Sequence, residues 1–207
     1  QRMIPTADGE VIVCNTSIIW KSTGWSANPA TATWAVKVTK SAPAGTGILA
    51  WGLDGDGVKF IATEYSSANR ADSRYVWVST DNGSTWAVVL DKTTIDPTNQ
   101  SHMHGVCYDP WADRFWLSHG HGAIRGVYYS DNDGGAWVKV GGAFQPDAAP
   151  TTLTATDDGI VCGSDSGDGG LYGIVRTVDP TQMEMIRTAR WVTTVLGVAG
   201  FAERGYR

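Results

Sequence analysis

The chain has 207 residues, of which 42% are hydrophobic and 18% charged, a balance typical of a folded chain and not of a disordered one. The net charge is −5 and no cluster of Lys or Arg stands out, which argues against nucleic acid or an anionic membrane as a partner. No apolar run approaches the roughly 20 residues of a membrane span and no charged-then-apolar leader is present, so membrane insertion is not expected.

The residue types favour short strands joined by tight turns. The chain holds 25 Gly and 10 Trp, with a surplus of Thr, Ser, Val and Asp. Its three cysteines, Cys14, Cys107 and Cys162, each lie in an apolar run. We therefore expect buried thiols and no disulfide framework.

A tryptophan recurs at the start of four predicted strands, in TATWAVKV, GSTWAVVL, GGAWVKVG and TARWVTTV. These residues, Trp34, Trp86, Trp137 and Trp191, are 51 to 54 positions apart. Turns that feed apolar runs keep the same phase, as at Asp8-Gly9, Asp56-Gly57 and Asp158-Gly159. The sequence therefore predicts four repeated units within one domain, 1–207. The units are 1–42, 46–95, 100–145 and 149–198, with 199–207 left over.

Four short strands are predicted within each unit, most clearly in the third. They cover His104–Tyr108, Arg114–Ser118, Arg125–Ser130 and Ala136–Val140, with Asp-Pro, Gly-rich and Asp/Asn-Gly turns between them. The runs YVWVS, FWLS and GVYYS are apolar at consecutive positions, as expected for strands covered on both faces. This pattern predicts an all-β fold, a β-propeller with four-stranded antiparallel blades.

The number of blades in the whole ring stays open at this level. Four units make either a complete small ring or part of a larger one. The segment Gly197-Val198-Ala199-Gly200-Phe201 resembles the first strand of a further blade.

Two turns with the pattern Ser-x-Asp/Asn-x-Gly-x-x-Trp, STDNGSTW and SDNDGGAW, lie between the third and fourth strands of the second and third units. They resemble the Asp-box of the bacterial neuraminidase repeat family, with Asn132 in place of the Asp in the second copy. A short side-chain carboxylate or amide caps the turn, glycine supplies a positive φ and the Trp packs below. We interpret both boxes as structural. Their residues are Ser79, Asp81, Gly83 and Trp86, and Ser130, Asn132, Gly134 and Trp137.

Members of the family that this chain resembles include sialidases, glycanases, sorting receptors, photosystem assembly factors and phage tail proteins, so the fold alone decides no activity. A sialidase would need three arginines, a Tyr–Glu pair and an acid/base Asp. Arg2-Met3-Ile4-Pro5 is similar to the first arginine element but has one extra residue. A glycanase would need two carboxylates across a groove. The carboxylates at blade turns that could supply them are Asp54, Asp56, Asp109 and Asp157.

All four histidines lie in the segment HMHGVCYDPWADRFWLSHGHG. Its two His-x-His pairs, His102 with His104 and His119 with His121, suggest a site for a divalent metal, because alternate residues of a strand share a face. The alternative is that these rings only hydrogen-bond to the backbone, since no Cys, Asp or Glu completes a recognised ligand spacing. The segment also resembles a His-x-His-Gly-Val…Asp-Pro…Trp…Gly element of Asp-box propellers from actinobacterial phages.

Trp111, in the turn DPWADR, is the aromatic residue we expect to contact a ligand, with Asp109 beside it. The sequence thus favours a propeller without catalytic residues that recognises a glycan or a cell-surface receptor, or that contacts other tail proteins. A virion or extracellular location is expected. The alternative is a glycoside hydrolase of the sialidase or endo-glycanase type. No cofactor beyond the divalent metal is expected.

Overall fold

The computed structural model describes residues 2–40, 46–66, 70–98, 101–121, 124–142, 150–164, 170–175 and 182–188. For residues 170–175 and 182–188 only the backbone is described. Trp191, the expected further strand at 197–201 and the remainder 199–207 lie outside these ranges.

Four antiparallel sheets follow one another along the chain, and we number them blades 1 to 4. Blade 1 consists of β1 (Arg2–Pro5), β2 (Val11–Cys14), β3 (Ile18–Thr23) and β4 (Thr33–Thr39). Blade 2 consists of β6 (Leu53–Gly55), β7 (Phe60–Thr63), β9 (Tyr75–Ser79) and β10 (Ala87–Asp91). Blade 3 consists of β11 (Met103–Asp109), β12 (Arg114–His119), β13 (Gly126–Ser130) and β14 (Val138–Lys139). Blade 4 consists of β16 (Pro150–Ala155), β17 (Gly159–Ser164), β18 (Gly170–Val175) and β19 (Gln182–Thr188).

Short elements complete the chain. A two-stranded ribbon pairs β5 (Thr46–Gly47) with β8 (Tyr65–Ser66), and β15 (Gly141–Gly142) adds to blade 4 parallel to β19. The helical turns of the described residues are all 3-10: η1 (Pro29–Thr31), η2 (Ala50–Gly52), η3 (Arg70–Asp72) and η4 (Lys92–Thr94). None of the described segments is an apolar helix of membrane-spanning length.

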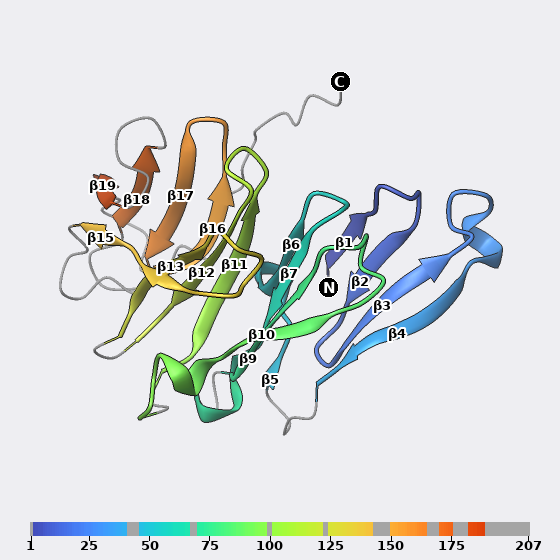
Figure 1. The fold of residues 1–207 in the computed structure, drawn as a ribbon, viewed down its shortest axis with the longest axis horizontal. Coiled ribbons are helices and arrows are strands. Elements are labelled where there is room, and N and C mark those ends of the chain that lie inside the picture. The colour runs from blue at the N-terminus through green and yellow to red at the C-terminus, as the bar shows by residue number, and fades with distance from the viewer. Residues whose placement is uncertain are drawn as a thin grey trace.

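The blades are arranged as in a β-propeller, which confirms the predicted fold class. The first strands of the blades, β1, β6, β11 and β16, lie next to one another in the middle of the molecule, and the later strands extend outward (Figure 1). Within the described residues, no strand pairing closes blade 1 onto blade 4.

The strands predicted for blade 3 agree with the structure to within two residues at each end. The consecutive apolar residues are also explained, because β9, β12 and β13 are buried along almost their whole length. A strand between two neighbouring blades loses solvent on both faces, so the alternation of a one-sided sheet is absent.

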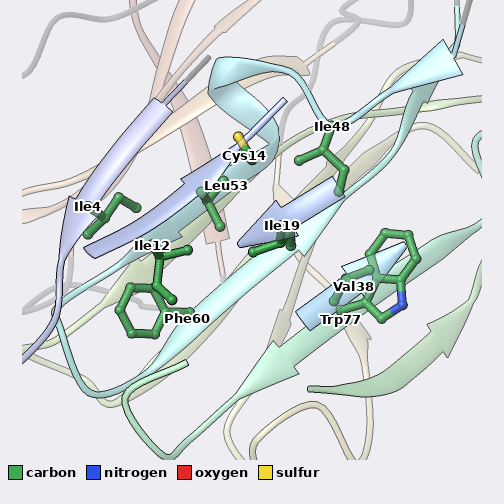
Figure 2. Packing of buried hydrophobic residues seen from close by; sticks show 10 residues of the cluster. Ile4, Ile12, Cys14, Ile19, Val38, Ile48, Leu53, Phe60 and Trp77 are labelled. Atoms are coloured by element: carbon green, nitrogen blue, oxygen red, sulfur yellow. The ribbon is translucent and has the colours of Figure 1, made fainter. Parts of the chain in front are cut away.

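The apolar core consists of three layers, one between each pair of neighbouring blades. The layer between blades 1 and 2 includes Ile12, Ile19 and Phe60, all fully buried (Figure 2). A second layer around Phe115 joins blades 2 and 3, and a third around Trp116 joins blades 3 and 4. All three cysteines are buried and free, as predicted.

The two Ser-x-Asp/Asn turns share one hydrogen-bond pattern. In the first, the Ser79 hydroxyl accepts the N–H of Gly83 at 3.0 Å and donates to Asp81 at 2.8 Å. Asp81 Oδ1 also accepts the N–H of Thr85 at 2.8 Å, and Trp86 Nε1 donates to the Gly83 carbonyl at 3.1 Å. These polar groups are therefore engaged within the turn itself.

The second turn repeats the first three of these bonds through Ser130, Asn132 and the N–H groups of Gly134 and Ala136, whereas Trp137 Nε1 has no hydrogen-bond partner among the described residues. Gly83 and Gly134 both have positive φ. A Cβ atom at Gly83 would lie 2.3 Å from Ile12 of blade 1, and one at Gly134 would lie 2.5 Å from Val89 of blade 2. Each turn thus packs against the preceding blade, which only glycine permits at this distance.

The three repeated tryptophans that the structure describes are not fully buried in the core. Trp86 and Trp137 are half-buried and pack against the first and second core layers, while Trp34 is 44% exposed. The large, fully buried aromatic side chains are instead Trp116, Phe60 and Phe115.

Candidate functional site

Three of the four histidines come together at the beginning of strand β11. His102 directly precedes β11, His104 lies within it and His121 follows β12. One ring nitrogen from each of these residues lies within 4.8 Å of those of the other two. We call His102, His104 and His121 the histidine cluster.

The rings of His102 and His104 have matching environments. His102 Nδ1 lies 2.6 Å from the carbonyl oxygen of Ser66, and His104 Nδ1 lies 2.6 Å from that of Pro150. Their Nε2 atoms face each other at 2.8 Å. The ring of Tyr65 covers His102, with centroids 4.7 Å apart. Both histidines are at most 5% exposed.

The local backbone explains how the two rings meet. The pairing of β11 with β12 shifts between Met103 and Gly105, so His104 is the extra residue of a β-bulge. Bulges re-aim a side chain and are common beside functional sites.

Gly120 shapes the site from the other side. Its N–H donates to the His102 carbonyl at 3.0 Å, and a Cβ atom on Gly120 would lie 2.2 Å from the His104 ring. The next residue, His121, donates its N–H to the Ser101 hydroxyl at 2.9 Å. The His-Gly-His sequence therefore lets the chain pass directly over His104 and return a third imidazole to the cluster.

Burial keeps the imidazoles of His102 and His104 neutral near neutral pH. It lowers the pKa of His102 to about 3, with a further contribution from the neighbouring His104. It lowers the pKa of His104 to about 4, against the hydrogen bond to Pro150. Neutral imidazole is the form that binds metal ions.

His119 does not join the cluster. It is fully buried at the end of β12, with Nδ1 2.9 Å from the Ser101 hydroxyl and its ring beside Tyr128. Its Nε2 has no hydrogen-bond partner among the described residues. Burial lowers its pKa to about 3. Of the four histidines proposed from the sequence as ligands, three can therefore act together.

Trp111 lies in the turn between β11 and β12, at the end of β11 opposite the histidine cluster, and is 50% exposed. The buried Asp109 holds this turn, because its Oδ1 accepts the N–H groups of Trp111 at 3.0 Å and Ala112 at 3.3 Å. Asp113 braces the other side by accepting from the Tyr108 hydroxyl and from Lys59, each at 2.7 Å. The indole is thus presented from a rigid turn, whereas Asp109 supports that turn from within.

The carboxylates considered for hydrolysis are largely engaged in structure. Asp54 is buried in β6 and accepts from Arg2 at 2.6 Å and from the Tyr108 N–H at 3.0 Å. Asp56 accepts the N–H groups of Val58 and Lys59 in its turn. Asp157 is exposed before β17.

Arg2, which is similar to the first arginine of a sialidase, is also paired, as are two further arginines. Arg2 donates to Asp54 and to the Leu53 carbonyl, Arg74 binds Asp91 and Arg114 binds Asp131. Arg176 lies outside the described residues.

Sequence reasoning missed the groups that orient the histidine cluster. The two acceptors are the backbone carbonyls of Ser66 and Pro150. Every residue has such a carbonyl, so the sequence does not single out these two. The Gly-His pair at 120–121 was a usable signal, because glycine between two histidines permits a close backbone approach.

Comparison with known proteins gives the fold and no family. No protein-family model matches the chain, and no curated protein matches its sequence. Among solved structures it is similar to a GH74 enzyme of Niastella koreensis, with a TM-score of 0.57 and 14% identity over 89% of this chain. A GH74 xyloglucanase of Xanthomonas campestris follows, with a TM-score of 0.52 and 15% identity over 87% of the chain. A Trypanosoma rangeli sialidase in complex with sialic acid has a TM-score of 0.51 and 12% identity over 89%.

These neighbours are much longer proteins. The chain spans 29% of each GH74 enzyme and 36% of the sialidase. Identities this low show a sialidase-like propeller fold and carry no active-site residue across.

Proposed function

We propose that this chain is a β-propeller module that recognises carbohydrate without hydrolysing it, through the surface around Trp111. The observation that carries the proposal is the half-exposed indole on a turn braced by Asp109 and Asp113. A rigid turn lowers the entropy lost on binding, and a flat aromatic face suits the apolar face of a sugar ring.

The solved neighbours add support, since the xyloglucanase and the sialidase bound to sialic acid act on or bind carbohydrates. The engagement of Asp54, Asp56 and Asp109 in ion pairs and turns favours binding over hydrolysis. A role as a phage tail-associated receptor binder, at a virion or extracellular surface, rests on the resemblance of the histidine segment to an element of Asp-box propellers from actinobacterial phages. Contacts with other tail proteins belong to the same proposal.

A glycoside hydrolase of the sialidase or endo-glycanase type is the second candidate. The fold neighbours favour it, because all of those described above are glycoside hydrolases or sialidases. In that case two carboxylates would face each other across a substrate groove.

A glycan array probed with the wild-type chain and with Trp111→Ala tests the proposal. We expect binding to a defined glycan class and a loss of about tenfold or more in affinity for the variant. Trp34→Ala is the matched control, because Trp34 is similarly exposed at 44% but lies on β4 of blade 1. Equal losses in both variants would contradict a site at Trp111.

Fluorogenic glycosides separate the two candidates. The proposal expects no turnover. Turnover that a single Asp→Asn change abolishes would establish the hydrolase instead.

A further inference from the structure

We propose that His102, His104 and His121 bind one divalent transition-metal ion, of the class of Zn²⁺, which ties blades 2, 3 and 4 together at one end of β11. The site is independent of the glycan surface, which lies at the other end of the same strand.

The two carbonyl contacts fix where those hydrogens lie. A carbonyl oxygen only accepts, so a ring nitrogen 2.6 Å from one must carry a hydrogen. His102 and His104 therefore both hold their hydrogen on Nδ1. In a neutral ring, the lone pair then lies on Nε2.

Two such lone pairs face each other across 2.8 Å, which is repulsive unless something positive lies between them. A second proton on either ring would satisfy the pair. Such a proton would bridge His102 and His104 alone and would give no role to His121, whose ring nitrogen lies within 4.8 Å of theirs. A metal ion satisfies both lone pairs at once through coordination bonds and can take His121 as a third ligand.

The hydrogen-bond arrangement is the one that metal-ligating histidines use. Such a histidine almost always donates its other ring N–H to a carbonyl, a carboxylate or water, which fixes the ring and raises its basicity. His102 and His104 meet this condition through Ser66 and Pro150.

His121 supplies the third ligand and the route of entry. It is only half-buried, while its N–H bond to Ser101 fixes its backbone beside the other two rings. Tetrahedral coordination at about 2.0–2.1 Å separates ligand nitrogens by about 3.3 Å. The Nε2 pair therefore opens slightly, and His121 moves inward, when the ion binds.

The donor set selects the class of ion. Three neutral imidazoles suit Zn²⁺, Co²⁺, Ni²⁺ or Cu²⁺, whereas Mg²⁺ and Ca²⁺ require oxygen ligands. Three protein ligands also leave a position for water or for an external group.

The carbonyl partners explain the tie between blades. Ser66 belongs to β8, which follows β7 of blade 2, and Pro150 begins β16 of blade 4. The histidines themselves belong to blade 3, where His102 precedes β11, His104 lies within β11 and His121 follows β12. An ion held here fixes the imidazole rings. Because the ring N–H groups of His102 and His104 bond to the carbonyls of Ser66 and Pro150, the ion also fixes the backbone at those two residues.

The experiment uses the 207-residue chain purified without a histidine tag. We expect about one zinc ion per chain by elemental analysis after exposure to zinc and dialysis. Zinc at 100-fold above its Kd should raise the Tm by about 5–10 °C over the value in chelator. Substitution with Co²⁺ should give the intense visible absorption of a tetrahedral site, and Mg²⁺ should produce neither effect.

Two variants distinguish loss of the site from loss of the fold. His121→Ala removes the most exposed ligand, and we expect it to keep the Tm of the chelated wild type while losing the zinc-dependent rise. His119→Gln is the matched control. It alters a buried histidine of the same segment and is expected to keep the zinc stoichiometry even if its Tm falls.

Substoichiometric metal in the wild type, or a chelator-insensitive Tm, would overturn the proposal in favour of a proton shared between His102 and His104. So would a zinc-dependent rise that survives in His121→Ala. Neither result bears on the glycan proposal, because the Trp111→Ala comparison is made with the histidines intact.

Discussion

Buried polar groups are paired differently at the two ends of β11. Near its last residues, the Asp54 carboxylate of blade 2 meets Arg2 of blade 1 and the Tyr108 N–H of blade 3, so a negative acceptor faces a positive and a neutral donor. At its beginning, His102 and His104 donate outward to carbonyls and turn two acceptor nitrogens toward each other.

This difference shows how neighbouring blades are joined. At the Asp54 end, the donors and the acceptor that join the blades all belong to the chain, and they are paired with one another. At the histidine end, the geometry is complete only with a cation. The first end should therefore stabilise the fold under all ionic conditions, and the second should do so only when metal is present.

The largest expected effect is at the Asp54 end. Asp54→Ala removes the acceptor of a buried N–H and the partner of Arg2, so we expect a loss of about 3 kcal/mol in the free energy of unfolding. Urea unfolding measures it, once with zinc and once with chelator. The loss should be the same in both.

Asp54→Asn is the control for this prediction. It keeps an acceptor for Tyr108 and loses only the charge, so its cost should be clearly smaller. If the cost of Asp54→Ala depended on zinc, the two ends would be coupled and the contrast between them would fail.

A smaller effect is expected from Gly120→Ala at the histidine end. The new Cβ would lie 2.2 Å from the His104 ring and would force that ring aside. We expect a cost of about 2 kcal/mol in chelator and the disappearance of the zinc-dependent rise in Tm.

Gly24→Ala is the matched control for this change. Gly24 has a φ of +85° with open space around it, so Ala there is strained without touching the site. It should lower stability and keep the full response to zinc. A Gly120→Ala protein that still responds to zinc would show that His104 is not a ligand.

The sequence predicted the blades well because their signals are local. The tryptophan period, the Asp-Gly turns and the runs of consecutive apolar residues each reflect a contact within one blade or with its neighbour. The strands of blade 3 were accordingly placed to within two residues.

The site was only partly predictable. The histidine segment stood out, but the bulge at His104 and the burial of His119 depend on how β11 pairs with β12. The role of Asp54 depends on a partner 52 positions away, and its neighbours in the sequence give no hint of Arg2. The burial of the repeated tryptophans could not be predicted. The repeat gives their position within each blade, but it does not show how far each side chain enters the core.

The smallest expected effect concerns an ion pair on the outer strands of blade 2. Arg74 binds Asp91 at 2.6 Å, and chiefly through this bond the pKa of Asp91 falls from 3.8 to about 2. Because the folded-state pKa lies below that of the unfolded chain, the pair stabilises the fold above about pH 4 and loses this contribution as the pH falls toward 2. Both side chains are substantially exposed, so solvent screens the pair and its effect on stability should be small.

Asp91→Asn tests this pair because asparagine still caps the turn at Thr93 while losing the charge. Urea midpoints of the wild type and the variant should differ slightly at neutral pH and converge in acid. A difference as large as that of Asp54→Ala would mean that exposed charges hold the blades together as strongly as buried ones. A small, acid-sensitive difference would instead show that burial gives the Asp54 ion pair its larger effect.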